Sequence, residues 1–236
     1  MAALLELTSV VTYRGPAQVL RGISLTVGER ESVCLVGRNG AGKTTTIDTI
    51  MGLLPSRSGS VSFNGQDVTR LPAHRRARLG IGYAPEDTGV FPDLTVGENF
   101  EIARWLARDR DGGSAASGDA FSVFPEVQDL LGRRGLNLSG GQKKMVAITR
   151  AMTLKPSILL LDEPFEGLAP VVVTRFIDAV RAIKAMGISI LIAESNVTNS
   201  TRVADRLYAL DRGDIIYQGL PQRVFDDAGV MRTLRG

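Results

Sequence analysis

Residues 37–44 read Gly-Arg-Asn-Gly-Ala-Gly-Lys-Thr, a glycine followed by four residues and then Gly-Lys-Thr. An apolar run at 32–36, typical of a buried strand, comes before them, and 44–54 has the composition of a helix. A strand, a glycine-rich loop and a helix in this order turn backbone N–H groups toward a bound phosphate chain. The stretch therefore predicts an α/β core organised around a phosphate-binding loop.

The residue types in this loop suit that chemistry. Glycines allow a tight turn and a close approach of the backbone to the ligand. Lys43 supplies positive charge to the terminal phosphates, and the Thr44 hydroxyl is an oxygen ligand for Mg²⁺. The helix that follows points its positive end at the same anion. The alternative is a glycine-rich turn without a ligand, but a chance match in a chain this long has odds on the order of 1%. The residues expected at the phosphates are Gly37, Arg38, Asn39, Gly40, Ala41, Gly42, Lys43, Thr44 and Thr45.

Two acidic residues follow a second apolar run. Residues 157–161 read as a buried parallel strand, and Asp162 and Glu163 come directly after it. Ligands bind at the carboxyl ends of strands in open α/β sheets. We expect Asp162 to hold Mg²⁺, directly or through water, and Glu163 to orient the attacking water or accept its proton. Such a pair is more often a helix cap, but the phosphate loop in the same chain favours a site.

A Ser-Gly-Gly-Gln stretch at 139–142 opens the next predicted helix, which runs to about residue 154. Ser139 is a suitable N-cap, and Gly140 and Gly141 leave backbone N–H groups open at a helix N-terminus. Together with Gln142 they form either a second anion site or an ordinary capped helix start.

Tyr13 ends the first of two predicted antiparallel strands, 4–13 and 19–27, which are joined by a turn at 14–16. An aromatic ring there can stack on a purine base, at about 1–3 kcal/mol; the alternative is an ordinary tyrosine at a strand end. A capping box at Thr95 and Glu98 predicts a helix over 96–107. Residues 108–120, rich in Gly, Ser and Asp, predict a mobile connector. The remaining predicted elements are a strand at 59–65, helices at 73–79 and 171–186, and strands at 81–84, 188–193, 206–210 and 214–218.

Composition excludes several classes of protein. The net charge is only +3 over 236 residues, and no run of basic residues resembles a nucleic-acid stripe. The one cysteine, Cys34, precludes a disulfide framework within the chain and lies in an apolar strand, where we expect it to be buried. No run of ~20 apolar residues is present to span a membrane. Residues 1–6 lack the features of a signal peptide. We therefore expect a cytoplasmic chain that reaches a membrane only through partners.

The three motifs in this order resemble those of the ATP-binding subunit of ABC transporters, and the resemblance covers essentially the whole chain. Residues 37–44 look like its Walker A motif, 138–142 like its signature motif, and 160–164 like its Walker B motif with the catalytic glutamate. The resemblance implies a P-loop NTPase of α/β class with a RecA-like core and an N-terminal antiparallel β subdomain. It implies one domain, 1–236, with an α-helical subdomain inserted at roughly 93–150.

The resemblance also implies ligands and partners. ATP and Mg²⁺ are the expected cofactors, and Tyr13 becomes the expected adenine-stacking residue. Transmembrane permease subunits and a second ABC ATPase, the same or different, are the expected partners, with a solute-binding protein engaged indirectly and no nucleic acid. Two such domains place ATP between the Walker A motif of one and the signature of the other. Residues 139–142 would then serve the partner's ATP site.

At a finer level the chain is similar to the smaller ATPase subunit of branched-chain amino acid import systems. The stretches 37–46, 91–99 and 167–170 carry that similarity. So does Glu86, which stands where most ABC ATPases have a glutamine that contacts Mg²⁺. A carboxylate can still be a Mg²⁺ ligand there, although it adds negative charge near the phosphates. The similarity implies uptake of branched-chain amino acids or related small polar solutes, such as urea, short amides or aromatic acids.

Two positions depart from the family pattern. Ser195 occupies the position of the switch histidine, and Ala169 lies in a loop after the Walker B motif that lacks the usual serine and aspartate. A serine is short and uncharged, so these changes bear on how fast this chain's own site hydrolyses ATP. Two alternatives stay open: a nucleotide-binding partner subunit with weak hydrolysis of its own, and a non-transport ABC ATPase.

Overall fold

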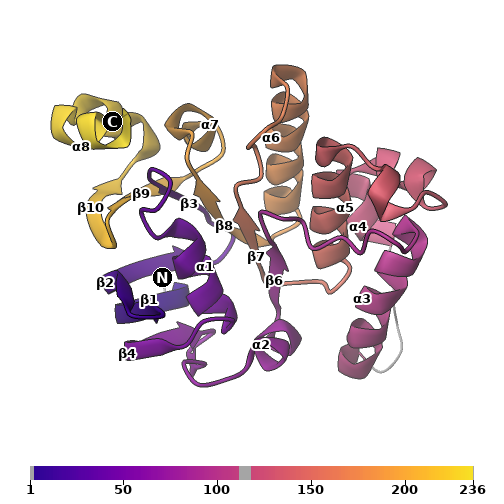
Figure 1. Ribbon diagram of the computed structural model, residues 1–236, viewed down its shortest axis with the longest axis horizontal. Coiled ribbons are helices and arrows are strands. Elements are labelled where there is room, and N and C mark those ends of the chain that lie inside the picture. Colours follow the sequence, from indigo (N-terminus) through magenta and orange to yellow (C-terminus); the bar gives the residue numbers. More distant parts are fainter. Residues whose placement is uncertain (1–2, 112–117, 236) are drawn as a thin grey trace.

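The computed structural model describes residues 3–111 and 118–235, which form two sheets with helices around and between them (Figure 1). The smaller sheet has four strands in the order β2-β1-β4-β5, and the larger has six in the order β10-β9-β3-β8-β7-β6. Chains that alternate strands and helices build such parallel cores. The α/β class predicted from the sequence is confirmed.

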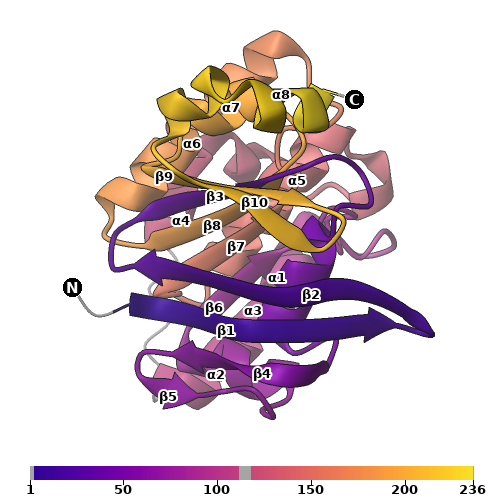
Figure 2. The same cartoon turned by 90° about the vertical axis from the view of Figure 1, so that its left-hand side faces the viewer.

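The smaller sheet is antiparallel and begins with a long hairpin. Its two strands, β1 (Ala3–Arg14) and β2 (Ala17–Gly28), alternate buried and exposed residues over much of their length, as a sheet with one covered face requires. The strands β4 (Ser56–Phe63) and β5 (Gln66–Asp67) extend the sheet on the other side of β1. Figure 2 shows β1 lying between β2 and β4.

The larger sheet is parallel except at its β10 edge. Every residue of its three central strands is buried, which explains why they read as unbroken apolar runs. The carboxyl ends of these neighbouring strands lie at one edge, and they bring together the loop after residue 36, the acids at 162–163 and residues 194–195. The strands are β3 (Ser32–Val36), β6 (Ile81–Ala84), β7 (Ile158–Asp162), β8 (Ser189–Glu194), β9 (Arg206–Asp211) and β10 (Asp214–Gly219).

Helices cover both faces of the larger sheet. The helix α1 (Lys43–Met51) packs between the two sheets, with Ile47 and Ile50 in one apolar core together with residues of both. On the opposite face, α5 (Gly140–Met152) and α6 (Pro170–Ala185) build a second core. The smaller helices are α2 (Ala73–Leu79), α7 (Val197–Thr201), η3 (Pro221–Asp226) and α8 (Ala228–Arg235).

A helical region lies between β6 and β7 in the sequence and stands apart from the smaller sheet (Figure 1). It holds α3 (Val96–Asp111), α4 (Gly118–Val123), the short 3₁₀ segments η1 (Pro125–Leu130) and η2 (Gly135–Asn137), and α5. The predicted capping box is confirmed, since the Thr95 N–H donates to Glu98 at 2.7 Å and the Glu98 N–H donates to the Thr95 hydroxyl at 3.2 Å.

The predicted connector at 108–120 is wrong at both ends. The helix α3 continues to Asp111, and α4 starts at Gly118; the rest of that stretch lies outside the described residues. Charged residues such as those at 108–111 are not excluded from helices, so composition alone misplaced the boundary. None of the helices in the described ranges has the length and apolar character needed to cross a membrane.

Candidate functional site

The phosphate loop joins β3 to α1 and is held in a conformation that needs glycine. Gly40 and Gly42 have φ of 83° and 111°, in the left-handed region. At Gly37 the reason differs, because a Cβ there would lie 2.4 Å from the carbonyl oxygen of Leu210. The loop is also tied to both sheets through the β9–β10 turn. The Gly213 N–H donates to the Ala41 carbonyl at 2.9 Å, and the Arg21 N–H donates to the Gly213 carbonyl at 2.9 Å.

A cavity of about 450 Å³ opens beside this loop. It brings together residues that the sequence placed in three separate motifs, namely Lys43 and Thr44, Glu86, and Glu163. Such a polar cleft at the carboxyl ends of parallel strands is where α/β proteins bind ligands. Its lining residues are Arg14, Val19, Asn39, Gly40, Gly42, Lys43, Thr44, Thr45, Glu86, Glu163 and Glu166.

Lys43 is buried at the floor of this cavity. Its ammonium group donates to the carbonyl of Gly37 at 2.8 Å and of Arg38 at 3.2 Å, and to the Ser195 hydroxyl at 3.0 Å. The Nζ atom also lies 3.0 Å from Oε1 of Glu163, and both side chains are less than a tenth exposed. A buried ammonium group forms strong, charge-assisted hydrogen bonds, so a bound anion can take the place of these acceptors around Lys43.

Glu163 is held by the end of the neighbouring strand. The Ser195 hydroxyl donates to Oε1 at 2.6 Å, and the Ser195 N–H donates to Oε2 at 3.0 Å. Burial raises the pKa of Glu163, but the hydrogen bond from Ser195 and the charge of Lys43 outweigh burial, and the pKa is lowered overall. The carboxylate is therefore ionised at neutral pH, the state in which it accepts a proton.

Asp162 lies next to the start of α1. The Thr44 hydroxyl donates to Oδ1 at 3.3 Å, while Oδ2 is buried and has no hydrogen-bond partner among the described residues. Burial raises the pKa of Asp162 to about 7; the Thr44 bond lowers it, and the negative charge of Glu163 raises it further. A buried carboxylate oxygen that lacks a donor, beside a hydroxyl, fits a divalent cation.

The oxygen ligands near Asp162 suit Mg²⁺, an ion that needs few ligands from the protein. Within residues 3–111 and 118–235, no group of three His, Cys, Asp or Glu side chains is arranged to hold a metal ion. Mg²⁺ is commonly held by one or two protein oxygens, with waters and substrate phosphates completing its shell. The donor set of Asp162 and Thr44 matches that requirement; Thr44 and Glu86 line the cavity, while Asp162 lies behind Thr44 and accepts a hydrogen bond from its hydroxyl.

The stretch at 139–142 does not line this cavity. Ser139 caps α5 in a capping box, in which the Gln142 N–H donates to the Ser139 hydroxyl at 3.3 Å and the Ser139 N–H donates to Gln142 at 3.0 Å. Gly140 and Gly141 begin the same helix. The structure therefore separates this helix start from the phosphate loop of its own chain.

Tyr13 lies at the edge of the site rather than in its wall. It is 37% exposed near the end of β1, and the next residue, Arg14, lines the cavity. Gly37, Arg38 and Ala41 belong to the loop but do not line the cavity; the first and last are buried behind it. The cavity therefore supports a ligand contact for the other loop residues more directly than for Tyr13, Gly37, Arg38 and Ala41.

Sequence reasoning missed several residues in and around the site: Val19 and Glu166 line the cavity, and Arg14 and Glu194 make the contacts described next. Arg14 donates to the Thr45 hydroxyl at 3.3 Å and forms an ion pair with Asp48 at 2.5 Å, which ties the hairpin to α1. Glu194 is buried, and it accepts the N–H groups of Phe165, Ser195 and Asn196. Burial raises the pKa of Glu194 to about 7. Its place at the carboxyl end of a buried strand, like that of Asp162, was the signal for it.

The phosphate loop, the acids at the adjoining strand end and the parallel sheet define a P-loop nucleotide-hydrolysing protein. Comparison with known proteins narrows this class. The sequence model of the family described as "ABC transporter" matches residues 20–166, which is more than half of the chain. The chain therefore belongs to the ABC transporter family, and it is an ATPase subunit of a transporter.

Individual relatives agree on the family and differ in cargo. The chain is 34% identical over 213 residues to the high-affinity branched-chain amino acid transport ATP-binding protein BraG of Pseudomonas aeruginosa, covering 90% of this chain and 91% of BraG. It is also 34% identical over 238 residues to the lipopolysaccharide export system ATP-binding protein LptB of Escherichia coli K12, covering 100% of this chain and 98% of LptB.

A solved structure confirms the fold of an ABC ATPase. The chain resembles the ADP conformation of MJ1267, an ATP-binding cassette of an ABC transporter, with a TM-score of 0.84 and 28% identity over the whole of both chains. The resemblance to this family that the sequence motifs indicated is therefore confirmed.

Proposed function

We propose that this chain powers the import of branched-chain amino acids or related small polar solutes by binding and hydrolysing ATP. The observation that carries the ATPase part is the cavity in which Lys43, Thr44 and Glu163 meet beside Asp162. The likeness to BraG supports the cargo, as do the motifs at 91–99 and 167–170. The equal identity to LptB makes lipopolysaccharide export the second candidate.

Each residue of the cavity has a proposed role. The loop residues 37–45 bind the phosphates through their N–H groups, and Lys43 exchanges its present acceptors for phosphate oxygens. Glu163 orients the attacking water and accepts its proton, which its ionised state allows. Tyr13 stacks on the adenine.

Asp162, Thr44 and Glu86 would hold Mg²⁺. The ion would neutralise charge that develops on the transferred phosphoryl group. Of these three residues, Asp162 has the buried oxygen that most needs a cation.

The proposed assembly contains two ATPase domains. Residues 139–142 lie outside the chain's own cavity and start a helix, where N–H groups attract an anion. We place them on the γ-phosphate bound by a second ABC ATPase, identical or different. In this proposal 1–236 is one domain, and the helical region at roughly 93–150 is an inserted subdomain.

The remaining partners are transmembrane permease subunits, with a solute-binding protein engaged indirectly. The chain would lie in the cytoplasm, attached to the inner face of the cell membrane through the permeases. We propose no nucleic acid as a partner, since the net charge is only +3. A non-transport ABC ATPase is no longer supported, because the chain is an ATPase subunit of a transporter.

The competing proposal is that the chain binds nucleotide as a partner subunit but hydrolyses ATP only weakly. Ser195 kept that possibility open at the sequence level. The structure favours hydrolysis, because Ser195 contacts both Lys43 and Glu163.

ATP turnover by the purified chain tests the proposal, with the wild type beside Glu163→Gln, at protein concentrations that allow dimers. We expect appreciable turnover in the wild type and its loss in the variant, with ATP binding kept. Tight binding without turnover in the wild type would instead assign the chain to the weakly hydrolysing half of a heterodimer. Uptake of labelled leucine by vesicles that contain the complete transporter separates import from export.

A further inference from the structure

Arg57 lies over the ring of Tyr13 on the smaller sheet. The guanidinium carbon of Arg57 lies 5.9 Å from the centroid of the Tyr13 ring, within the range of a cation–π contact. The two residues are close because β1 pairs with β4, with Thr12 opposite Ser56 and Val11 opposite Ser58. Among the described residues, Arg57 has no hydrogen bond or ion pair that would hold its guanidinium elsewhere.

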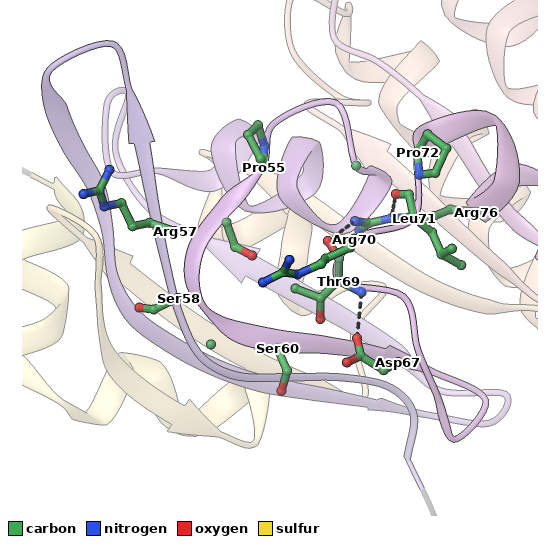
Figure 3. Close-up of a pocket in the computed structure, with 13 residues that line it drawn as sticks. Pro55, Arg57, Ser58, Ser60, Asp67, Thr69, Arg70, Leu71, Pro72 and Arg76 are labelled. Carbon is green, nitrogen blue, oxygen red and sulfur yellow. Dashed lines mark hydrogen bonds between the residues drawn. The ribbon is translucent and has the colours of Figure 1, made fainter.

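Tyr13 lies on β1, which has β2 on one side and β4 on the other, and the surroundings of the two sides differ. On the β2 side, Val19 lines the phosphate-loop cavity together with Arg14. On the β4 side, Arg57 borders a separate cavity of about 790 Å³ between β4 and α2. Figure 3 shows Arg57 extending away from that cavity toward the β1–β2 hairpin, whereas Arg70 points into it. Arg57 thus approaches Tyr13 from the side away from the phosphate loop.

We infer that Arg57 is a positioning residue that backs the Tyr13 ring and so presents its other face to the base of the nucleotide. This inference rests on the proposed function, in which Tyr13 stacks on adenine. The ring is 37% exposed, and no described contact fixes its hydroxyl. An exposed ring loses rotational freedom when a base stacks on it. A guanidinium already stacked on the rear face removes part of that cost.

Binding measurements with two ligands separate this role from a general effect of charge. Mg²⁺-ATP carries the base, and inorganic tripolyphosphate carries only the phosphates. We expect Arg57→Ala to weaken ATP binding about two- to fivefold, the size of an exposed cation–π contact, and to leave tripolyphosphate binding unchanged. Arg57→Lys should restore part of the loss, because an ammonium keeps the charge but not the planar stack. Turnover at saturating ATP should not change.

Arg70→Ala is the matched control. It removes the same charge from an exposed arginine that lines the neighbouring cavity and points into it (Figure 3), and only Arg57, of these two arginines, is found over the Tyr13 ring. We expect no change in ATP binding. A double-mutant cycle completes the test: in a Tyr13→Ala background, Arg57→Ala should have no further effect.

Two results would overturn the inference. One is equal weakening of ATP and tripolyphosphate binding by Arg57→Ala; the other is an Arg57→Ala effect that persists without Tyr13. If the wild type binds tripolyphosphate but does not distinguish it from ATP, base stacking fails, and the role of Arg57 fails with it. If the wild type binds neither ligand, the proposed function itself is overturned.

Discussion

The Ser195 hydroxyl donates a 2.6 Å hydrogen bond to Oε1 of Glu163, joining the residue after β8 to the residue after β7. The Ser195 N–H holds the other carboxylate oxygen, and Lys43 contacts both side chains. From the sequence alone, so short and uncharged a side chain in place of the switch histidine raised the question of how fast this site hydrolyses ATP. The structure instead gives Ser195 a direct contact with the proposed base.

Ser195→Ala should lower turnover by about three- to tenfold, because it removes the hydroxyl, one of the two donors by which Ser195 fixes the Glu163 carboxylate. ATP binding should change little. Ser195→Thr, which keeps a hydroxyl, is the control. Steady-state turnover at saturating ATP measures the effect.

Ser139→Ala should lower turnover of the assembled complex more than Ser195→Ala does. Ser139 caps the helix start that we place on the partner's γ-phosphate, whereas Ser195 adjusts a residue that retains other contacts. The measurement compares both variants in complexes with matched composition. A greater loss with Ser195→Ala would contradict the shared-site arrangement.

Glu194→Gln should stabilise the folded chain increasingly as the pH rises from about 4.5 to about 7. Burial raises the pKa of Glu194 in the folded chain to about 7 from its ordinary value of 4.5. Below this window the carboxyl is protonated in both states. Within it, the unfolded chain ionises first and the wild type loses stability as pH rises. Denaturant unfolding of both proteins at several pH values measures the difference, and a constant difference would refute the assignment.

Gly37→Ala should destabilise the chain by about 1–3 kcal/mol and weaken nucleotide binding. The new Cβ would lie 2.4 Å from the Leu210 carbonyl oxygen and 3.0 Å from the Cβ of Ala41, so the loop or β9 must shift. Gly132→Ala is the control, since nothing lies within 4 Å of its Cβ. Equal midpoints of unfolding for the two variants would contradict this steric account.

Arg76→Met should destabilise the chain by about 3 kcal/mol or more. The buried Arg76 guanidinium donates to four backbone carbonyls, two of them at the C-terminus of α1, and methionine would leave these acceptors without their donor. Arg75→Met changes an exposed neighbour and should stay within about 0.5 kcal/mol of the wild type. Chemical denaturation measures both, and similar values for the two would exclude the structural role of Arg76.

The sequence was sufficient for the α/β class and for the central strands, because a strand buried on both faces must be apolar throughout. The strand after residue 157 and the one after residue 188 were both predicted on that ground. Boundaries were predicted less well. The helix α3 continues past residue 107, where the charged sequence has no apolar period to mark a helix, and β5 has only two residues.

In the site, too, some residues could be predicted from the sequence and others could not. Loop residues and the acids at 162–163 stand in local patterns, so they could be predicted. The contact between Ser195 and Glu163 joins residues 32 positions apart, and only the packing of β7 beside β8 creates it. Arg57 carries no motif at all; its position beside Tyr13 follows from the register between β1 and β4.

The β9–β10 turn has a mechanical consequence. Gly213 accepts from Arg21 in the smaller sheet and donates to Ala41 in the phosphate loop, so this one residue connects the loop to both layers. A loop that tightens around a phosphate chain would therefore pull on both sheets through Gly213. The amides of Gly213 and Arg21 therefore report nucleotide binding through slower hydrogen exchange, although neither residue lines the cavity.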